Sequence, residues 1–371
     1  MFIVIGIVFL LVYSALVYYI GRSSWRFLQP VLRNRFKWAY IIIISFLAVS
    51  FILGRIFVSQ SYLQVIGAYW LVLFVLLLML LPIAHLIIWI ARMMKFSKQG
   101  AQQTISIILL VSLVVIIAVG SFNAYSPYVK QYDVSIVKDN VQLNDAKDPL
   151  RIVVASDMHF GYLSGKNHAK RLVKEINALE PDIILFPGDI IDDQLAPVVA
   201  QGIPAILQNL QSTYGTYASL GNHDRTTEGL EQLIEVIESS NIKVLYDEVE
   251  LLEDKLYIIG RKDHSDKARV PLQQLTEKLD HTKPIIILEH QPKDFAEAEQ
   301  QGADLILSGH THRGQIAPAH LITQLLFEND WGYLQKNNMH SIVTSGYGFW
   351  GPPIRIGSRS EIVQINVSFA P

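Results

Sequence analysis

The chain contains no cysteine among its 371 residues. Disulfide bonds, cysteine-ligated zinc sites and cysteine nucleophiles are therefore excluded, and the chain is compatible with any redox compartment. Charge is also scarce, because only 17% of the residues are Asp, Glu, Lys or Arg and the formal net charge is -2. A chain so close to neutrality has no global electrostatic attraction for nucleic acid, and we expect no nucleic-acid partner.

Hydrophobic residues make up 51% of the chain, and their excess lies before about Asn123. Four apolar stretches stand out there: Phe2–Ile20, Trp38–Phe57, Tyr69–Ala91 and Thr104–Phe122. Each approaches or exceeds the roughly 20 residues that a helix needs to cross a bilayer. The first is not interpreted as a signal peptide, because no basic residue precedes it and three further stretches follow. Residues 1–122 are therefore predicted to form an all-α transmembrane domain of four helices in the lipid bilayer of the cell membrane.

Basic residues between these stretches predict an orientation. The first connection holds Arg22, Arg26, Arg33, Arg35 and Lys37, and the third holds Arg92, Lys95 and Lys98. The second connection, 59–68, holds none. Since cytoplasmic loops are enriched in Lys and Arg, the first and third connections are expected in the cytoplasm. With an even number of spans, the rest of the chain is then extracytoplasmic.

Residues 123–149 are polar, include Pro127, and are interpreted as a linker. Within them, Tyr132–Val137 alternates apolar and polar residues, which favours an added edge strand. From Leu150 to the end of the chain, predicted strands and helices alternate, so 150–371 is predicted to be an α/β domain. The expected strands include Ile152–Ala155, Asp182–Phe186, Thr216–Leu220, Ile285–Leu288 and Asp304–Leu307, and the expected helices include Ala169–Leu179, Pro197–Leu210 and Gly229–Ser239. Periodicity alone leaves open whether one doubly wound sheet or two sheets form.

Polar side chains follow five of these strands, at the point where each strand ends. The segments are Asp157-Met158-His159, Gly188-Asp189-Ile190-Ile191-Asp192, Gly221-Asn222-His223-Asp224, Glu289-His290 and Gly309-His310-Thr311-His312. Asp, His and Asn are ligands of hard and borderline divalent metals, and strand ends of an α/β sheet converge at one edge. A site with this many ligands is best interpreted as two metals that share a bridging carboxylate, the arrangement used to hydrolyse phosphate esters.

The order D-x-H, G-D-x-x-D, G-N-H-D, H, G-H-x-H resembles the calcineurin-like metallophosphoesterase superfamily, over roughly Leu150 to Phe369. It is most similar to a membrane-associated bacterial branch whose last block is G-H-T-H-G-G-Q, except that Arg313 replaces the first glycine of G-G-Q. This departure affects the charge and shape expected at the substrate mouth. The resemblance implies an αββα sandwich, with two facing mixed sheets and helices outside them.

The resemblance also implies a role for each residue of the site. The first metal would be held by Asp157, His159 and His312, the second by Asn222, His290 and His310, with Asp189 bridging the two. The two divalent ions could be Mn, Fe, Zn, Ni or Co, because Asp, His and Asn suit all of them. The nucleophile would be a hydroxide bridging the ions.

Other side chains are assigned around this centre. His223 is expected to protonate the leaving alkoxide with Asp224 orienting it, and Asp192 to hold a ligand histidine in its tautomer. Arg313 or Arg355 is expected to bind a substrate phosphate, although Arg355 is equally well interpreted as a surface residue. Residues without a matching block are interpreted as surface or turn residues: Asp193, His168, His264, Asp263, His281, His320 and His340.

The insertion Ala317–Asn338 is expected to select the substrate. Apolar residues near the mouth, which include Trp331, Tyr333, Phe349, Trp350, Ile322 and Leu325–Phe327, suit contact with lipid or equally a place in the core. The predicted function is therefore a membrane-anchored, two-metal phosphoesterase that acts on a phosphorylated small molecule, a lipid or a lipid-linked pyrophosphate. The alternative is a transport or signalling membrane protein whose phosphoesterase-like domain is regulatory.

Overall fold

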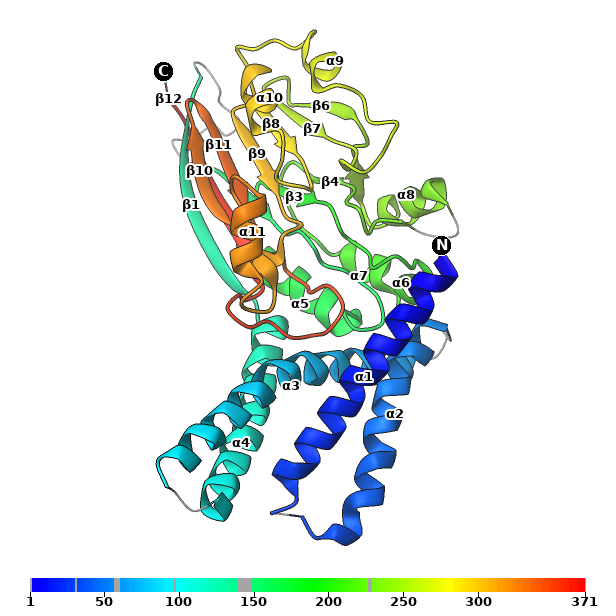
Figure 1. Ribbon diagram of the computed structural model, residues 1–371. Coiled ribbons are helices and arrows are strands. Elements are labelled where there is room, and N and C mark those ends of the chain that lie inside the picture. The colour runs from blue at the N-terminus through cyan, green and yellow to red at the C-terminus, as the bar shows by residue number, and fades with distance from the viewer. Residues whose placement is uncertain are drawn as a thin grey trace. The chain divides into compact units, whose positions relative to one another are not determined.

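A computed structural model describes residues 2–30, 32–56, 61–95, 98–138, 149–225 and 229–370. The chain divides into two compact units, Met1–Gly120 and Ser121–Pro371. The first unit is all helical, and the second contains every described strand (Figure 1).

Four long helices account for the first unit. They are α1 (Phe2–Leu28), α2 (Lys37–Ile56), α3 (Ser61–Met93) and α4 (Lys98–Tyr125), with a short 3-10 turn η1 (Asn34–Phe36) before α2. All four are long and apolar enough to cross a membrane, with apolar spans of 21 to 32 residues. The four predicted stretches are confirmed as long apolar helices; α1, α3 and α4 are longer than predicted, and α2 begins one residue earlier than predicted.

The side chains of the first unit are distributed as expected for helices surrounded by lipid. Leu11 and Ile42 are 66% exposed, whereas Trp70 and Leu81 are buried between helices. The indole N–H of Trp70 donates to the Tyr13 hydroxyl (2.8 Å), which in turn donates to the carbonyl of Ala48 (2.8 Å). Polar groups are thus satisfied inside the unit while apolar side chains cover its outside, which is the requirement that a bilayer imposes.

Two six-stranded mixed sheets form the centre of the second unit. The first has the order β1-β12-β2-β3-β4-β5, and the second has the order β10-β11-β9-β8-β7-β6. The strands of the first sheet are β1 (Tyr128–Val137), β2 (Leu150–Val154), β3 (Ile183–Pro187), β4 (Thr216–Ser219), β5 (Ile242–Val244) and β12 (Glu361–Ala370). Those of the second are β6 (Glu248–Leu252), β7 (Leu256–Gly260), β8 (Ile285–Leu288), β9 (Leu305–Ser308), β10 (Gly332–Lys336) and β11 (Met339–Val343).

Three apolar layers hold the sheets and helices together. One layer joins the facing sides of the two sheets, as where Ile152 and Ile183 of the first meet Ile286 and Leu305 of the second. The other two layers pack helices on the outer face of each sheet. The helices are α5 (Lys166–Asn177), α6 (Ala196–Ala200), α7 (Ile203–Leu207) and α8 (Leu230–Glu238) on the first sheet, and α9 (Leu272–Thr276) and α10 (Phe295–Gln300) on the second; η2 (His312–Gly314) and α11 (His320–Leu326) lie in loops. The αββα sandwich is confirmed.

Parallel pairing brings the ends of five strands together. β2, β3 and β4 are mutually parallel in one sheet, and β8 and β9 are parallel in the other. These strands are mostly buried and apolar, such as Ile183–Pro187, so they are fixed in the core, and the charged and imidazole side chains of the five segments come after the strands end. The loops that follow therefore present their side chains at one edge of the sandwich.

The structure differs from the expected elements in three places. The single helix predicted over Pro197–Leu210 is two helices, α6 and α7, separated by Gly202 in a left-handed conformation (φ 65°). The insertion Ala317–Asn338 contains α11 and β10, which the pattern did not predict. The segment interpreted as a linker contains β1, which begins at Tyr128, earlier than the predicted strand, and pairs in parallel with the whole of β12. The rest of that segment, 139–148, lies outside the described residues.

The register of β1 gives a stability prediction. Ile136 is 1% exposed and packs between the sheets, whereas its neighbour Val137 is 63% exposed. Ile136→Ala should lower the free energy of unfolding by about 2–5 kcal/mol, while Val137→Ala should change it by less than about 0.5 kcal/mol. Urea unfolding of the full chain in detergent, followed by tryptophan fluorescence, measures both. Equal effects would show that β1 is not part of the core.

Candidate metal centre

The side chains predicted to bind metal come together at the edge where the five strands end. Asp157 and His159 follow β2, Asp189 follows β3, Asn222 follows β4, His290 follows β8, and His310 and His312 follow β9. Among the described residues, three overlapping groups of carboxylates and imidazoles have donor atoms within 4.8 Å of one another: Asp157, His159 and His312; Asp157, Asp189 and His290; and His159, Asp192 and His223.

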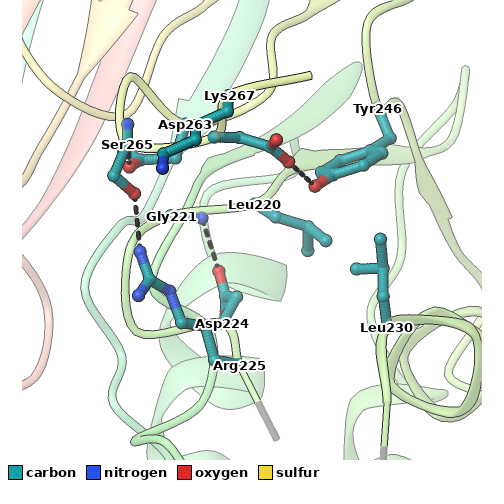
Figure 2. A pocket seen from close by; sticks show the side chains of 10 residues that line it. Leu220, Gly221, Asp224, Arg225, Leu230, Tyr246, Asp263, Ser265 and Lys267 are labelled. Atoms are coloured by element: carbon teal, nitrogen blue, oxygen red, sulfur yellow. Dashed lines mark hydrogen bonds between the residues drawn. The ribbon is translucent and has the colours of Figure 1, made fainter. Parts of the chain in front are cut away.

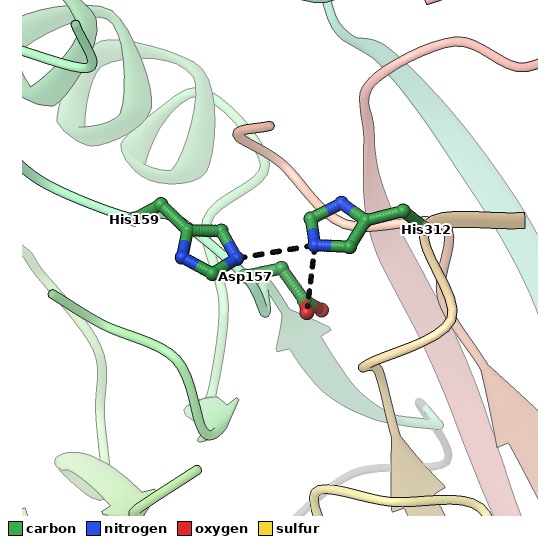
Figure 3. A group of neighbouring side chains, drawn as sticks. All are labelled: Asp157, His159 and His312. Atoms are coloured by element: carbon green, nitrogen blue, oxygen red, sulfur yellow. Dashed lines mark hydrogen bonds and ion pairs between the residues drawn. The ribbon is translucent and has the colours of Figure 1, made fainter. Parts of the chain in front are cut away.

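The first group is shown in Figure 3. The Nε2 atoms of His159 and His312 face each other at 3.1 Å, and His312 Nε2 is 3.4 Å from Asp157 Oδ1. All three side chains are buried. Two nitrogen ligands at about 2.1 Å from one tetrahedral ion are about 3.4 Å apart, so this spacing fits a shared metal ion.

Asp189 connects this group to the second. Its Oδ2 lies 3.1 Å from His290 Nε2 and 3.7 Å from His159 Nε2, so one oxygen atom faces a histidine of each group. Its Oδ1 accepts a hydrogen bond from the backbone N–H of His223 (2.8 Å). This is the position expected for a carboxylate shared between two ions.

His310 lies beside His290, and Asn222 lies in the turn that contacts Asp189 through the His223 N–H. The amide oxygen Oδ1 of Asn222 is buried and has no hydrogen-bond partner among the described residues, which is unfavourable for a polar atom unless a ligand occupies that side. The ring of His310 is 5.2 Å from that of His290, measured between centroids. His310 thus lies beside the second group, while its own backbone N–H donates to Asp157 Oδ1 (3.0 Å).

Burial and mutual attraction shift the pKa values of these groups. Burial raises the pKa of Asp157 to about 6 and lowers the pKa of His159 to about 4. Burial also opposes the charge of Asp189 and His290, but their mutual attraction outweighs it, lowering the pKa of Asp189 and raising the pKa of His290 to about 10. Since metal binding displaces ligand protons, a divalent cation bound here would take the place of a proton on His290 beside Asp189.

The backbone is strained where these side chains are presented. Asp157, His159, Asp189, His310 and His312 all have left-handed conformations, with φ between 45° and 69°. Each costs about 1–2 kcal/mol for a residue other than glycine. Hydrogen bonds between neighbouring loops hold the conformation, including Asp157 N–H to Gly188 O (3.1 Å) and His159 N–H to Asp189 O (3.0 Å). The surrounding fold therefore fixes the direction of these side chains.

Two glycines leave the space that the carboxylates occupy. A Cβ at Gly221 would lie 2.2 Å from Asp189 Oδ1, and a Cβ at Gly309 would lie 2.1 Å from Asp157 Oδ2. Any side chain at either position would displace the carboxylate. This explains why glycine precedes Asn222 and His310 in these two segments.

The partner predicted for His223 is wrong. Asp224 is buried, and its carboxylate accepts from the backbone N–H groups of Gly221 (2.8 Å) and Ile191 (2.9 Å) rather than from His223. Asp193 Oδ2 instead lies 3.1 Å from His223 Nδ1, and the Asp193 N–H donates to the His223 carbonyl (3.1 Å). The tight turn at 221–224 points the Asp224 carboxylate back into its own loop. Asp193 had been interpreted as a surface residue because it stands one position beyond the G-D-x-x-D block.

The pKa of His223 is set by two opposing effects. Burial lowers it, but the hydrogen bond to Asp193 and the nearby negative charges of Asp189, Asp193 and Asp192 raise it overall. Asp192 lies close to His159 as expected, with its Oδ1 3.7 Å from His159 Nδ1, a distance longer than a hydrogen bond. The imidazolium form of His223 is therefore favoured.

The expectation that Arg355 binds substrate is also wrong. Arg355 is fully buried, and burial lowers its pKa to about 10. Its guanidinium donates to the carbonyls of Ser345 (2.6 Å), Gly348 (2.8 Å), Gly346 (3.3 Å) and His312 (3.3 Å), and Nη2 lies 3.1 Å from His312 Nδ1. Because all five donors of an arginine face the protein here, Arg355 fixes the loop 345–348 against His312.

Arg313 is only partly buried, and its guanidinium stacks on the ring of Trp331 at 3.8 Å from the centroid. Unlike Arg355, it is therefore held against an aromatic ring and is partly open to solvent. Three residues that the sequence assigned to the surface or to turns are in fact buried: His168, Asp263 and His340. Distant segments contribute to this burial, as with the His168 carbonyl, which accepts from the Tyr347 hydroxyl (2.9 Å), and such contacts leave no local pattern in the sequence.

A cavity of about 430 Å³ adjoins the turn that carries Asn222 and His223 (Figure 2). It is lined by Leu220, Gly221, Asp224, Arg225, Leu230, Tyr246, Asp263, Ser265, Asp266 and Lys267. Arg225 donates to the hydroxyl of Ser265 across it, and the Tyr246 hydroxyl donates to Asp266. The lining thus combines cationic, acidic and apolar groups, and its members Gly221 and Asp224 flank Asn222 and His223 in one turn.

Comparison with known proteins gives consistent results. A family model described as calcineurin-like phosphoesterase matches residues 150–314. An uncharacterized metallophosphoesterase of Helicobacter pylori is 33% identical over 233 residues, covering 61% of this chain and 62% of that protein. A transmembrane protein with metallophosphoesterase domain of Danio rerio is 32% identical over 276 residues, covering 70% of this chain and 62% of that protein. An uncharacterized metallophosphoesterase of Aquifex aeolicus is 30% identical over 226 residues, covering 59% of this chain and 85% of that protein.

The burial of Arg355 predicts that its removal affects stability and not substrate affinity. Arg355→Met should lower the free energy of unfolding by at least about 2 kcal/mol, because several buried carbonyls lose their donor. Arg313→Met, at the partly exposed mouth, should change it by less than about 1 kcal/mol. Urea unfolding in detergent compares the two variants. A stable Arg355→Met protein with only a raised KM would restore the substrate-binding role.

Proposed function

The chain belongs to the calcineurin-like metallophosphoesterase family, and from this we propose that it is a membrane-bound, metal-dependent phosphoesterase that hydrolyses phosphate esters or pyrophosphates. The observation that carries the proposal is the convergence of Asp157, His159, Asp189, His290 and His312 at one sandwich edge. The orphaned amide oxygen of Asn222 points to the same conclusion. A domain that had lost catalysis for a purely regulatory role would have no need to keep every donor.

Two divalent ions are proposed for this centre. Asp157, His159 and His312 would hold one, Asn222, His290 and His310 the other, and Asp189 would be shared between them. When bound, such ions provide Lewis-acid activation of water and neutralise charge on the phosphoryl oxygens. Oxygen and nitrogen donors without thiolate fit Mn, Fe, Zn, Ni or Co.

His223 is proposed as the general acid. Asp193 holds Nδ1, which leaves Nε2 free to give a proton to the departing oxygen of the substrate. The His223 ring lies 5.2 Å from that of His159, measured between centroids, so the acid stands beside the proposed centre. The hydrogen bond to Asp193 and the negative charges around His223 raise its pKa, which favours the protonated form that a general acid needs. Asp193 is thus a positioning residue for the acid, and Asp224 shapes the turn.

The substrate is proposed to be a lipid or a lipid-linked phosphate. Support comes from the four helices of membrane-spanning length, and from a relative named as a transmembrane protein with metallophosphoesterase domain. The matched segment spans 62% of the length of the Helicobacter pylori and Danio rerio relatives, so the activity of the whole protein is part of this proposal. Arg313 and the 430 Å³ cavity beside His223 are the candidate contacts for the phosphate and the leaving group.

The catalytic unit is proposed to lie outside the cytoplasm. Arg22 and Arg26 lie in the last turns of α1, and Arg92 ends α3 near Lys95, whereas the described end of α2 and start of α3 offer no such cluster. This asymmetry supports cytoplasmic placement of the α1–α2 and α3–α4 connections.

Hydrolysis of p-nitrophenyl phosphate and bis-p-nitrophenyl phosphate by the detergent-solubilised full chain tests the proposed activity. After metal stripping, activity should return with one or more of Mn, Zn, Ni or Mg.

Asp189→Asn should lose both bound metal and activity. His223→Ala should keep its metal but lower kcat by about 10²–10⁴-fold, and Asp193→Asn should lower kcat by about 10-fold or more.

Asp254→Asn is the matched control for this experiment, because the Asp254 carboxylate is 84% exposed and pairs only with Lys283. It should behave as the wild type in metal content and rate. A folded wild-type protein that no metal activates would overturn the proposed function, and a normal rate in His223→Ala would remove the general-acid role alone.

Cysteine labelling tests the orientation, since the natural chain has no cysteine to interfere. A membrane-impermeant maleimide applied to intact cells should label Asp254→Cys in the catalytic unit. It should not label Met94→Cys, an exposed residue just after α3, until the cells are opened. The reverse labelling pattern would place the catalytic unit in the cytoplasm.

A further inference from the structure

Helix α11 has four large apolar side chains that no described residue buries. Leu321, Ile322, Leu325 and Leu326 are 54%, 59%, 86% and 70% exposed, and no residue of the helix is buried. The helix HLITQLL contains no Lys, Arg, Asp or Glu. A contiguous apolar surface of this kind on a folded domain marks a contact with a partner or a membrane.

The residues just before α11 form hydrogen bonds with the segment 355–360, and the same segment forms hydrogen bonds with the last turn of α4. The Ala317 N–H donates to the Ile356 carbonyl (2.7 Å), and the Ile356 N–H donates to Gln315 (2.9 Å). Four residues on, the Ser360 N–H donates to the Asn123 carbonyl (3.0 Å) and its hydroxyl to Ala124 (2.8 Å). One short segment, 355–360, therefore links the start of α11 to the last turn of a helix whose apolar span is Gln102–Tyr125.

The neighbourhood of α11 has the side chains typical of a membrane interface. Trp350 and Tyr333 are 54% and 43% exposed. The cationic groups of Arg313 and Lys130 stack on the ring of Trp331, at 3.8 Å and 3.6 Å from its centroid. Aromatic residues with Lys and Arg beside an apolar helical face are the composition of helices that lie in the headgroup region.

The same helix borders the proposed metal centre. Phe327, the residue after α11, lies 6.0 Å from the ring of His310, measured between centroids. Asp330 accepts from Thr311 through its carbonyl (2.7 Å) and from Thr323 of α11 through its carboxylate (2.7 Å). If α11 binds a surface, the metal centre is therefore held at a set distance from that surface.

We propose that α11 (orange in Figure 1) inserts its apolar face into the surface of the lipid bilayer and holds the mouth of the metal centre at headgroup level. The occupant of this face is phospholipid, because the chain enters the catalytic unit from a helix of membrane-spanning length, and the last turn of that helix, at Asn123 and Ala124, bonds to the segment that also holds the start of α11. This inference goes beyond the proposed activity: the contact exists whether or not the centre is catalytic, and its test does not use turnover.

Lipid quenching of a fluorophore on single cysteines tests the contact. Leu325→Cys and, on the same helix face, Leu321→Cys are labelled in the full chain and reconstituted into phosphatidylcholine vesicles. The control is Val137→Cys, which is also an exposed aliphatic residue (63%) but lies at the far end of β1, about 30 Å along the strand from Tyr128. Vesicles that contain phosphatidylcholine with a nitroxide near the ester linkage should quench the two α11 labels at least about 2-fold and leave the control unchanged.

Three results would overturn the proposal. Labels on α11 that nitroxide lipid does not quench, but aqueous iodide does, would show that the helix faces water. Labels shielded from both quenchers would show that protein, such as a second copy of the chain, covers the face. Equal lipid quenching at Val137→Cys would show that the quenching is not specific to α11. Thermal unfolding of each labelled variant confirms that the fold is intact, which the high exposure of these residues favours.

Discussion

The charge of one buried carboxylate organises the candidate site. Asp189 is 1% exposed, and its two oxygens face His159, His290 and the backbone N–H of His223, which come from three different loops. A buried anion is costly unless cations or donors surround it, so the arrangement of these loops and the negative charge depend on each other. The same electrostatic constraint raises the pKa of His290, favours the imidazolium form of His223 and creates the place for a divalent cation.

Two arginines satisfy buried polar groups in the loops around the centre. Arg355 holds the loop 345–348 and the carbonyl of His312, while Arg269 binds Glu289, the residue before His290, through Nη1 at 2.8 Å. In both cases a planar guanidinium with several donors satisfies groups that would otherwise be buried without partners. Histidines in strained left-handed conformations can be kept in one orientation only if the loops around them are tied down in this way.

The chain also has two surfaces on which many apolar side chains are exposed. One covers the four helices of the first unit, and the other is α11 beside the proposed metal centre. A phosphoesterase that acts on lipid must meet a charged group at the boundary between water and hydrocarbon. The proposed contact of α11 with lipid would bring the metal centre of the catalytic unit to such a boundary.

The sequence by itself predicted the four long apolar helices and most of the polar residues that gather at the sandwich edge. Span length and apolar content are local properties, and polar residues directly after buried strands must lie at the sheet edge. Only the tertiary structure decided that Asp193, and not Asp224, contacts His223, that Arg355 is buried, and that α11 is exposed. These outcomes depend on turns that direct a side chain within a few ångströms, and on contacts between residues far apart in the chain. Such turns and long-range contacts leave no periodic pattern in the sequence. Hydrophobic periodicity indicates which face of a helix or strand is buried, but not which polar group a side chain contacts.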